Sequence, residues 1–327
     1  MVPAQPNSTA EETASYPPPF PCVKTANRPV LIKSLYSIVL YLGLGYLLLR
    51  RWDILLVILG VVVIHEAGHF WAMKHYRYAD VSVLFLPFIG AFVKGSKKEI
   101  SQKQSAVIYL AGPLPGILLG LIGHIICQAY PSLFLGRIPV QLIAQLLIWT
   151  NLLNLLPIYP LDGGQLLNRV FLNEEGRASN IFFLISMGII AGIAIFTKFY
   201  ILLLFPAFFI YRFLTAKSHL KLEEEIERSG ADINKEYEEL SPEDYWKIRS
   251  ALIRYTPALQ GIAIGPPYQY HDKEERIAEE IAHLLQRNLL LDISMKEKIT
   301  VIAIWVLFLL LPWILSVEFL LLRYFVR

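Results

Sequence analysis

Two histidines and a glutamate stand at the spacing of a zinc-binding helix. His65, Glu66 and His69 form the pattern His-Glu-x-x-His. Residues four apart lie on one face of a helix, so the two imidazoles can hold one metal ion between them. The glutamate occupies the position from which a carboxylate activates a metal-bound water. The pattern predicts a catalytic zinc site; the alternative is a set of polar residues hydrogen-bonded between helices.

The sequence around this motif is apolar enough to lie inside a membrane. The motif falls in an apolar run over 53–74, which has spanning length. An ionisable side chain near the middle of a membrane helix costs about 2.5–3.5 kcal/mol or more, so such residues are candidates for function. This setting favours a metal site over ordinary helix packing.

The composition agrees with a membrane protein. The chain has 327 residues, of which 55% are hydrophobic and 17% charged, whereas about 25% of residues are charged in soluble domains. A net charge of +3 is too small and too localised to indicate nucleic-acid binding. The two cysteines, Cys22 and Cys127, supply neither a disulfide framework nor a metal spacing.

Apolar runs of spanning length recur along the chain. They lie near 34–49, 53–74, 105–129, 139–157, 180–197, 199–214 and 299–322. Only Thr197-Lys198-Phe199 separates the fifth run from the sixth, so that pair could form one broken unit. The expected fold is an α-helical polytopic membrane protein with about six to seven transmembrane helices.

One apolar stretch, 81–93, is too short to span. Pro87 and Gly90 interrupt it, and valine and phenylalanine are frequent on both sides of that break. Runs of this length are more often re-entrant or interfacial, and β-branched and aromatic residues favour strands. We expect a small re-entrant β-hairpin here; the alternative is an ordinary interfacial loop.

The polar parts of the chain divide it into four segments. Residues 1–30 are proline-rich and polar, which predicts a disordered tail without the pattern of a cleaved signal peptide. A membrane-embedded core is expected over 31–214 and a C-terminal transmembrane helix over 299–327. Between them, 215–298 should form a charged, mainly helical module with an amphipathic helix over 272–291.

The distribution of lysine and arginine predicts the orientation in the membrane. Six basic residues lie from Lys74 to Lys103, at the end of the second run and in the loop before the third, whereas the next loop offers only Arg137. Since cytoplasmic loops carry the excess of basic residues, the N-terminal tail, 75–104, 158–178 and 215–298 are expected in the cytoplasm. Arg50 and Arg51 in the first outer turn count against this orientation.

A third metal ligand is needed, because catalytic zinc takes three protein ligands and keeps one position open for water. Asp162 is the candidate. Pro157 and Pro160 break the preceding helix, and Gly163-Gly164 permit the tight backbone by which a short carboxylate reaches a metal. The alternative is an aspartate that caps the next helix.

These motifs together resemble the site-2 protease family of intramembrane zinc metalloproteases. The resemblance rests on His65-Glu-Ala-Gly-His69, on Asn154-x-x-Pro157-x-x-x-x-Asp162-Gly163, and on Gly112-Pro-Leu-Pro-Gly116 between them. The segment 81–93 is similar to the family's membrane-inserted β-hairpin. The resemblance covers roughly 53–170. Gly116 departs from the pattern, because the family often has asparagine or serine there.

The resemblance implies roles for individual residues. His65, His69 and Asp162 would bind Zn²⁺, and Glu66 would be the catalytic base. Asn154 would lie near the site, where it could orient the substrate or stabilise the oxyanion. The expected substrate contacts are Phe88, Gly90 and Asn151.

The predicted function is an intramembrane zinc endopeptidase that hydrolyses a peptide bond in or near a transmembrane segment of a membrane-tethered substrate, as in regulated intramembrane proteolysis. Its partners would be a membrane-spanning protein or peptide and the lipid bilayer, without nucleic acid. We expect a multi-pass protein of a bacterial inner or plasma membrane, with the active site toward the cytoplasm. The alternatives are a catalytically silent membrane scaffold or chaperone, and a zinc peptidase that matures a soluble peptide at the cytoplasmic face.

Overall fold

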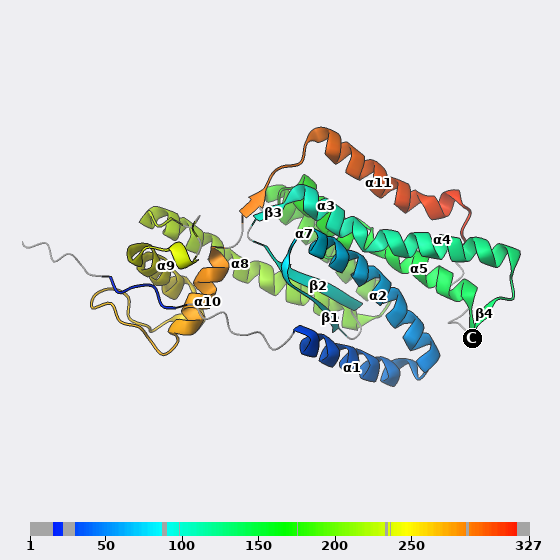
Figure 1. Cartoon of the computed structure of the whole chain (residues 1–327), viewed down its shortest axis with the longest axis horizontal. Helices are drawn as coiled ribbons and strands as arrows, with labels where there is room; N and C mark the ends of the chain where they lie inside the picture. The colour runs from blue at the N-terminus through cyan, green and yellow to red at the C-terminus, as the bar shows by residue number, and fades with distance from the viewer. Residues whose placement is uncertain are drawn as a thin grey trace, which may run out of the picture. The chain divides into compact units, whose positions relative to one another are not determined.

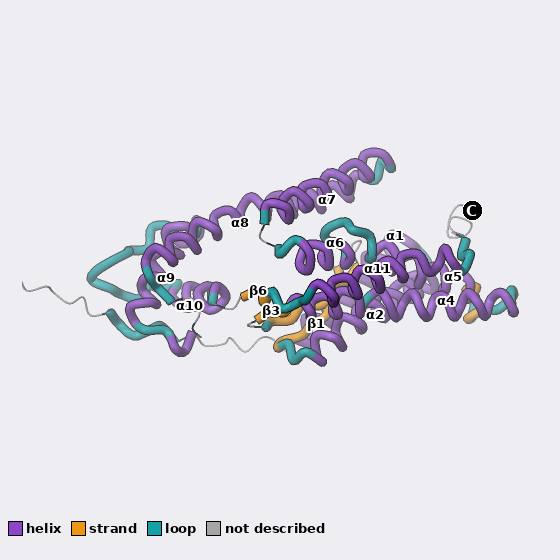
Figure 2. Tube along the Cα trace, turned by 90° about the horizontal axis from the view of Figure 1, so that it is seen from above, coloured by secondary structure: helices purple, strands orange, loops and turns teal. Residues whose placement is uncertain are grey.

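The structure is a computed structural model that describes residues 16–21, 30–86, 90–97, 99–174, 176–232, 235, 237–285 and 288–318. The chain divides into two compact units. We call Ala26–Ile210 with Arg287–Arg327 the apolar unit, and Met1–Thr25 with Tyr211–Gln286 the charged unit. Helices make up most of both (Figures 1 and 2).

The apolar unit contains the long hydrophobic helices. In chain order they are α1 (Val30–Leu49), α2 (Trp52–His75), α3 (Gln102–Ala111), α4 (Pro113–Ala129), α5 (Val140–Asn154), α6 (Asp162–Leu166), α7 (Arg177–Phe196), the first part of α8 (Leu204–Ser229) and α11 (Met295–Ile314). A π-helical turn over Leu167–Phe171 follows α6, and a 3-10 turn over Tyr200–Leu203 precedes α8.

Four of the predicted spans are long and apolar enough to cross a membrane: Trp52–His75, Gln102–Ala129, Arg177–Phe196 and Met295–Ile314. The other three predicted runs form shorter apolar helices over Ser34–Leu49, Val140–Asn154 and Tyr200–Tyr211. The predicted mostly helical fold, with helices that could cross a membrane, is therefore confirmed, while the count of six to seven crossings remains a prediction.

The predicted hairpin is present. Strands β1 (Ala79–Leu86) and β2 (Gly90–Ser96) pair antiparallel, with Val83 opposite Val93. Gly90 opens β2 at φ +119°, a left-handed conformation that favours glycine. The turn between the strands, which includes Phe88, lies outside the described residues.

Helix α1 covers the outer edge of β1. Ser34 Oγ donates a hydrogen bond to the Val83 carbonyl (2.6 Å), and the Phe85 N–H donates to Ser37 Oγ (3.0 Å). Figure 1 shows α1 running along the β1 side of the hairpin. In an antiparallel pair, when one residue directs its N–H and C=O groups away from the partner strand, the residue opposite it does the same on the other edge of the hairpin. The outward N–H and C=O groups of β2 are therefore those of Ala91 and Val93, which face Phe85 and Val83.

The core of the apolar unit lies where α4, α5 and α6 meet, around the fully buried Ile117, Ile148 and Leu155. Helix α11 closes one side of it, because Trp305 Nε1–H donates to the Leu155 carbonyl (2.8 Å). Two further strand pairs are short: β3 (Glu99–Ser101) with β6 (Asn288–Leu290), parallel, and β4 (Phe134–Leu135) with β5 (Ile138–Pro139), antiparallel.

The charged unit has a separate core. It contains the second part of α8, then α9 (Pro242–Tyr255) and α10 (Glu274–Leu284), with 3-10 turns over Tyr237–Glu239 and Pro257–Leu259. Helix α9 begins at an N-cap serine, Ser241, whose Oγ accepts from the Asp244 N–H (3.0 Å). The predicted amphipathic helix is α10, which is shorter than the predicted 272–291, and its Ile277 and Ile281 are fully buried.

Two features of the charged unit differ from the sequence expectations. Helix α8 runs unbroken from Leu204 to Ser229, across the predicted boundary between 31–214 and 215–298. The sequence predicts a disordered tail over 1–30, but Tyr16–Pro21 contacts the core of this unit through Tyr16 and Phe20. Composition indicates disorder only when a segment has little apolar surface to bury, and these six residues carry two aromatic rings and four prolines.

Candidate metal centre

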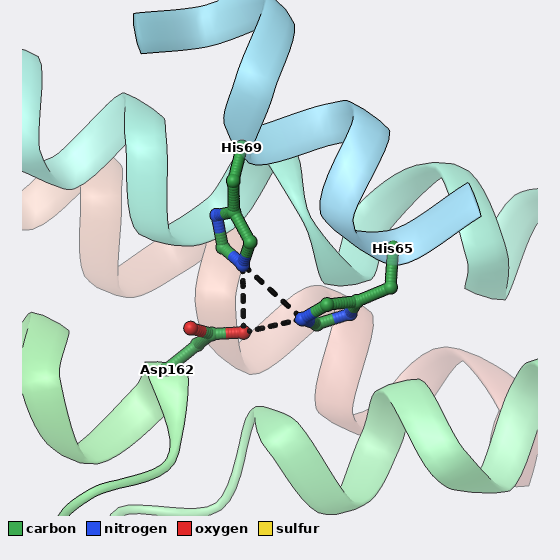
Figure 3. A group of neighbouring side chains, drawn as sticks. All are labelled: His65, His69 and Asp162. Atoms are coloured by element: carbon green, nitrogen blue, oxygen red, sulfur yellow. Dashed lines mark hydrogen bonds and ion pairs between the residues drawn. The ribbon is translucent and has the colours of Figure 1, made fainter. Parts of the chain in front are cut away.

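Helix α2 and the start of α6 bring three side chains to one buried point (Figure 3). His65 Nε2 lies 3.0 Å from Asp162 Oδ2, and His69 Nε2 lies 3.3 Å from the same oxygen. The two Nε2 atoms are 3.1 Å apart. All three residues are buried. Together they offer two imidazole nitrogens and a carboxylate oxygen, a donor set that could hold a metal ion.

The far nitrogen of each ring fixes which nitrogen faces the cluster. His65 Nδ1 lies 2.8 Å from Asn151 Oδ1, and His69 Nδ1 lies 2.8 Å from the Ile108 carbonyl. The Asn151 amide nitrogen donates to the Leu147 carbonyl, so its oxygen is the atom that faces His65. Both acceptors require a proton on Nδ1, which leaves each Nε2 with a lone pair directed at Asp162.

This donor set fits a zinc ion. Two imidazole lone pairs and a carboxylate oxygen at 3.0–3.3 Å repel one another unless a proton or cation lies between them. Nitrogen and oxygen ligands about 2.0–2.1 Å from a tetrahedral zinc lie about 3.3 Å from one another. In addition, Asp162 Oδ2 is buried without a hydrogen-bond donor in the described part of the chain.

Glu66 lies beside the cluster without coordinating it in this arrangement. It is buried, and its Oε2 atom has no hydrogen-bond partner among the described residues. A buried carboxylate oxygen left without a partner is costly, which marks it as a candidate to bind water or substrate. Glu66 directly follows His65 in the sequence, so it lies next to a proposed metal ligand.

Glycines allow the elements of this site to approach one another. A Cβ atom on Gly163 would lie 2.1 Å from the Leu155 carbonyl oxygen, and one on Gly164 would lie 2.3 Å from the Ile158 carbonyl carbon. Only glycine therefore lets Asp162 begin α6 directly against the loop that follows α5. The sequence predicts a tight backbone conformation at these two glycines; in the structure both lie within helix α6, and the property used is the absence of a side chain.

Gly112 and Gly116, from the motif Gly112-Pro-Leu-Pro-Gly116, also lie at close contacts. A Cβ atom on Gly112 would lie 2.3 Å from His69 Nε2, and one on Gly116 would lie 2.1 Å from Asn151 Nδ2. The Asn151 side chain therefore occupies the space beside Gly116, the position where the motif departs from its usual pattern.

The remaining predicted site residues lie elsewhere. The sequence predicts that Asn151 contacts substrate, but its amide contacts the His65 ring on the side away from Asp162. The Asn154 amide donates to the Thr150 carbonyl (3.2 Å), and it forms no hydrogen bond with the three ligands in the described part of the chain. Gly90 lies in the hairpin, and Phe88 is outside the described residues.

Two contributors to the site were not identified from the sequence. The Ile108 carbonyl orients His69, and any residue type supplies a carbonyl, so no sequence signal marks it. Gly68 is the second contributor. A Cβ atom there would lie 1.9 Å from the Ala111 carbonyl oxygen, so the lack of a side chain at Gly68 lets α2 lie against the end of α3. Its place inside His65-Glu-Ala-Gly-His69 was the available signal.

Comparison with known proteins adds family information. Residues 53–138 match the family described as Peptidase family M50, a range that contains His65, Glu66 and His69 but ends before Asp162. A zinc metalloprotease of Methanocaldococcus jannaschii is 29% identical over 126 residues, which cover 38% of this chain and 36% of that protein. Stage IV sporulation protein FB of Bacillus subtilis is 31% identical over 129 residues, covering 38% and 42%.

Among solved structures, the site-2 protease from Methanocaldococcus jannaschii aligns with a TM-score of 0.41 at 24% identity, covering 54% of this chain and 84% of that chain. The matches to the two curated relatives, the zinc metalloprotease and the sporulation protein, span only about two fifths of the length of those proteins.

Proposed function

The matches confirm the chain's resemblance to the site-2 protease family, and from that premise we propose that it is an intramembrane zinc endopeptidase. Its reaction is hydrolysis of a peptide bond in or near a transmembrane segment of a membrane-tethered substrate. The observation that carries the proposal is the buried triangle of His65, His69 and Asp162. Beside it lies Glu66, whose Oε2 has no hydrogen-bond partner in the described part of the chain.

His65, His69 and Asp162 would hold the zinc ion. When bound, zinc polarises the scissile carbonyl and makes its water a nucleophile near neutral pH. Glu66 would take a proton from the attacking water and deliver it to the leaving amine. Its buried Oε2 is suited to this role, because no donor in the described residues competes for it. Asn151 and the Ile108 carbonyl hold the histidine rings in the tautomer that binds metal.

The β2 edge is the surface proposed to hold the substrate. A helical substrate has its carbonyls in internal hydrogen bonds, so it must unwind before attack. An unwound segment can then add to an exposed strand by β-augmentation. Ser34 and Ser37 already occupy the β1 edge, which leaves the outward groups of Ala91 and Val93 for this pairing.

The finer features of the membrane arrangement belong to the proposal. They are six to seven crossings, a hairpin that re-enters the membrane, and a site toward the cytoplasm of a bacterial inner or plasma membrane. The four long apolar helices and the basic loop 75–104 support them. The charged unit is proposed as a cytoplasmic module that limits substrate approach.

The test is expression of the wild-type protein or of Glu66→Gln in bacteria. Proteomics then identifies the protein fragments that are released from the membranes of each strain. Glu66→Gln should keep its zinc and release no fragment. Equal fragment patterns from the two proteins would support the silent scaffold instead. Cleavage sites confined to soluble segments would support the peptide-maturing enzyme.

A further inference from the structure

The N-terminal segment Tyr16–Pro21 is built to adopt a polyproline II conformation. Four of its six residues are prolines, with φ fixed near −65°. Tyr16 and Phe20 each precede a proline, which excludes them from the helical region. The segment forms neither helix nor strand in the structure. A polyproline II segment makes no internal hydrogen bonds, so its carbonyls remain free to accept from another surface.

The charged unit supplies donors to three of these carbonyls. Trp246 Nε1–H donates to the Pro17 carbonyl (2.9 Å), and the Tyr237 hydroxyl donates to the Phe20 carbonyl (2.7 Å). The Tyr270 hydroxyl donates to the Pro18 carbonyl. Polyproline II has three residues per turn, so Pro17 and Phe20 lie on the same face of the segment. One face of the ligand is thus bound through two successive turns.

Aromatic rings line the surface on which the segment lies. The Tyr16 and Tyr268 ring centroids are 4.7 Å apart, and those of Phe20 and Tyr270 are 5.4 Å apart. The Trp246 ring contacts both Tyr268 (5.1 Å) and Tyr270 (5.8 Å). Figure 1 shows the segment, in dark blue, running beside the loop that precedes α10. Aromatic-lined grooves with ring donors are the usual receptors for proline-rich peptides.

Contacts that do not involve the segment hold this receptor surface in place. The Arg249 guanidinium lies 4.5 Å from the Trp246 ring centroid and forms a buried ion pair with Glu274 (2.7 Å). It also donates to the carbonyls of Ala263 (3.3 Å) and Gln269 (3.4 Å), in the loop that carries the two receptor tyrosines. The receptor surface is therefore held in place by contacts within Tyr211–Gln286, independently of the segment.

We propose that the Tyr211–Gln286 part of the charged unit is a receptor for proline-rich, polyproline II peptides, and that the chain's own Tyr16–Pro21 is its exchangeable ligand. Pro18 and Pro21 are exposed, and the other four residues of the segment are only half-buried. With the segment in place Trp246 is fully buried, and its indole N–H donates to the Pro17 carbonyl. The site is therefore selective for a ligand that offers a carbonyl there.

The first experiment uses the full chain in detergent with a protease site inserted between Val23 and Lys24. After the cut, excess synthetic peptide of residues 14–21 should displace the N-terminal fragment during gel filtration. The uncut chain should bind the fluorescein-labelled peptide at least about tenfold more weakly than the cut and washed chain, because a tethered ligand acts at millimolar effective concentration. A fragment that excess peptide cannot displace is part of the core, which would overturn the proposal.

Sequence selectivity and the receptor residues are tested by anisotropy on the cut chain. A peptide with alanine at 17–19 should bind at least about tenfold more weakly, because it must order on binding. Tyr270→Phe, which removes a donor from an exposed side chain, should weaken binding several-fold, whereas the matched variant Tyr255→Phe should not. Equal binding of the alanine peptide, or equal affinity of the two variants, would also overturn it.

Discussion

Removal of the Asn151 side chain tests how the zinc site is oriented. Asn151 Oδ1 accepts from His65 Nδ1–H at 2.8 Å, and both residues are buried. Asn151→Ala leaves that N–H without a partner, and a buried unsatisfied donor costs about 1–3 kcal/mol. Since tenfold in an equilibrium constant is about 1.4 kcal/mol, zinc affinity should fall by about 5- to 140-fold. This range agrees with the loss of about 10–100-fold usual for partners of metal-bound histidines.

A second route to the same contact provides an independent estimate. Gly116→Ala would place a Cβ atom 2.1 Å from Asn151 Nδ2, so the amide must move away from His65. Gly60→Ala is the matched control, because it lies on α2 with His65 and its Cβ atom would meet nothing within 4 Å. Asn151→Asp keeps an acceptor for the ring and should retain most of the affinity.

The assay is chelator competition for zinc on purified protein. Asn151→Ala and Gly116→Ala should both release zinc at lower chelator concentration than wild type and Gly60→Ala. If all four proteins hold zinc equally, the Asn151 contact does not orient His65, and the role proposed for that hydrogen bond is wrong. A loss in Gly116→Ala alone would trace the effect to helix separation.

Three further changes have defined outcomes. Gly112→Ala would place a Cβ atom 2.3 Å from His69 Nε2, so zinc measured by atomic absorption should be lost, while circular dichroism shows whether the helices remain. Asp162→Ala removes a ligand and should lower zinc content, and full occupancy would exclude it from the coordination set. In the charged unit, burial raises the pKa of Glu274, but hydrogen bonds from Arg249 and a neighbouring hydroxyl outweigh it, so this pKa lies below its ordinary value of 4.5. As the pH falls, Glu274 takes up a proton in the unfolded chain before it does so in the folded protein. The free energy of unfolding should therefore fall as pH drops below about 4.5. Glu274→Gln should remove that contribution to the pH dependence and cost about 3–5 kcal/mol at neutral pH, since it leaves Arg249 buried and unpaired; an unchanged acid unfolding curve would contradict the assignment.

The catalytic motif and the hairpin could be predicted because their signals are local. The spacing of His65 and His69 is a property of one helix, and the hairpin follows from a short β-branched run with a central break. Asp162 required a longer inference, from helix-breaking prolines and two glycines, and the structure brings its carboxylate to both histidines.

What the sequence did not predict depends on contacts between distant segments. Asn151 contacts a residue 86 positions away, and no local pattern distinguishes that use from substrate binding. The ordered segment at Pro17 is similar, because its partner Trp246 lies 229 positions further along. Composition indicates whether a segment has its own core, but it does not indicate whether another segment offers a surface for it.

The hydrogen bonds from α1 to the outer edge of β1 predict which substrate sequences the proposed enzyme accepts. With Ser34 and Ser37 on the β1 edge, a substrate strand that adds to the hairpin, as proposed, pairs with β2. In a strand, alternate side chains point to opposite faces. Preferences around the cut should therefore repeat every second residue, not every third or fourth as on a helix. Proline should be excluded at alternate positions, where its missing N–H would leave a β2 carbonyl without a donor.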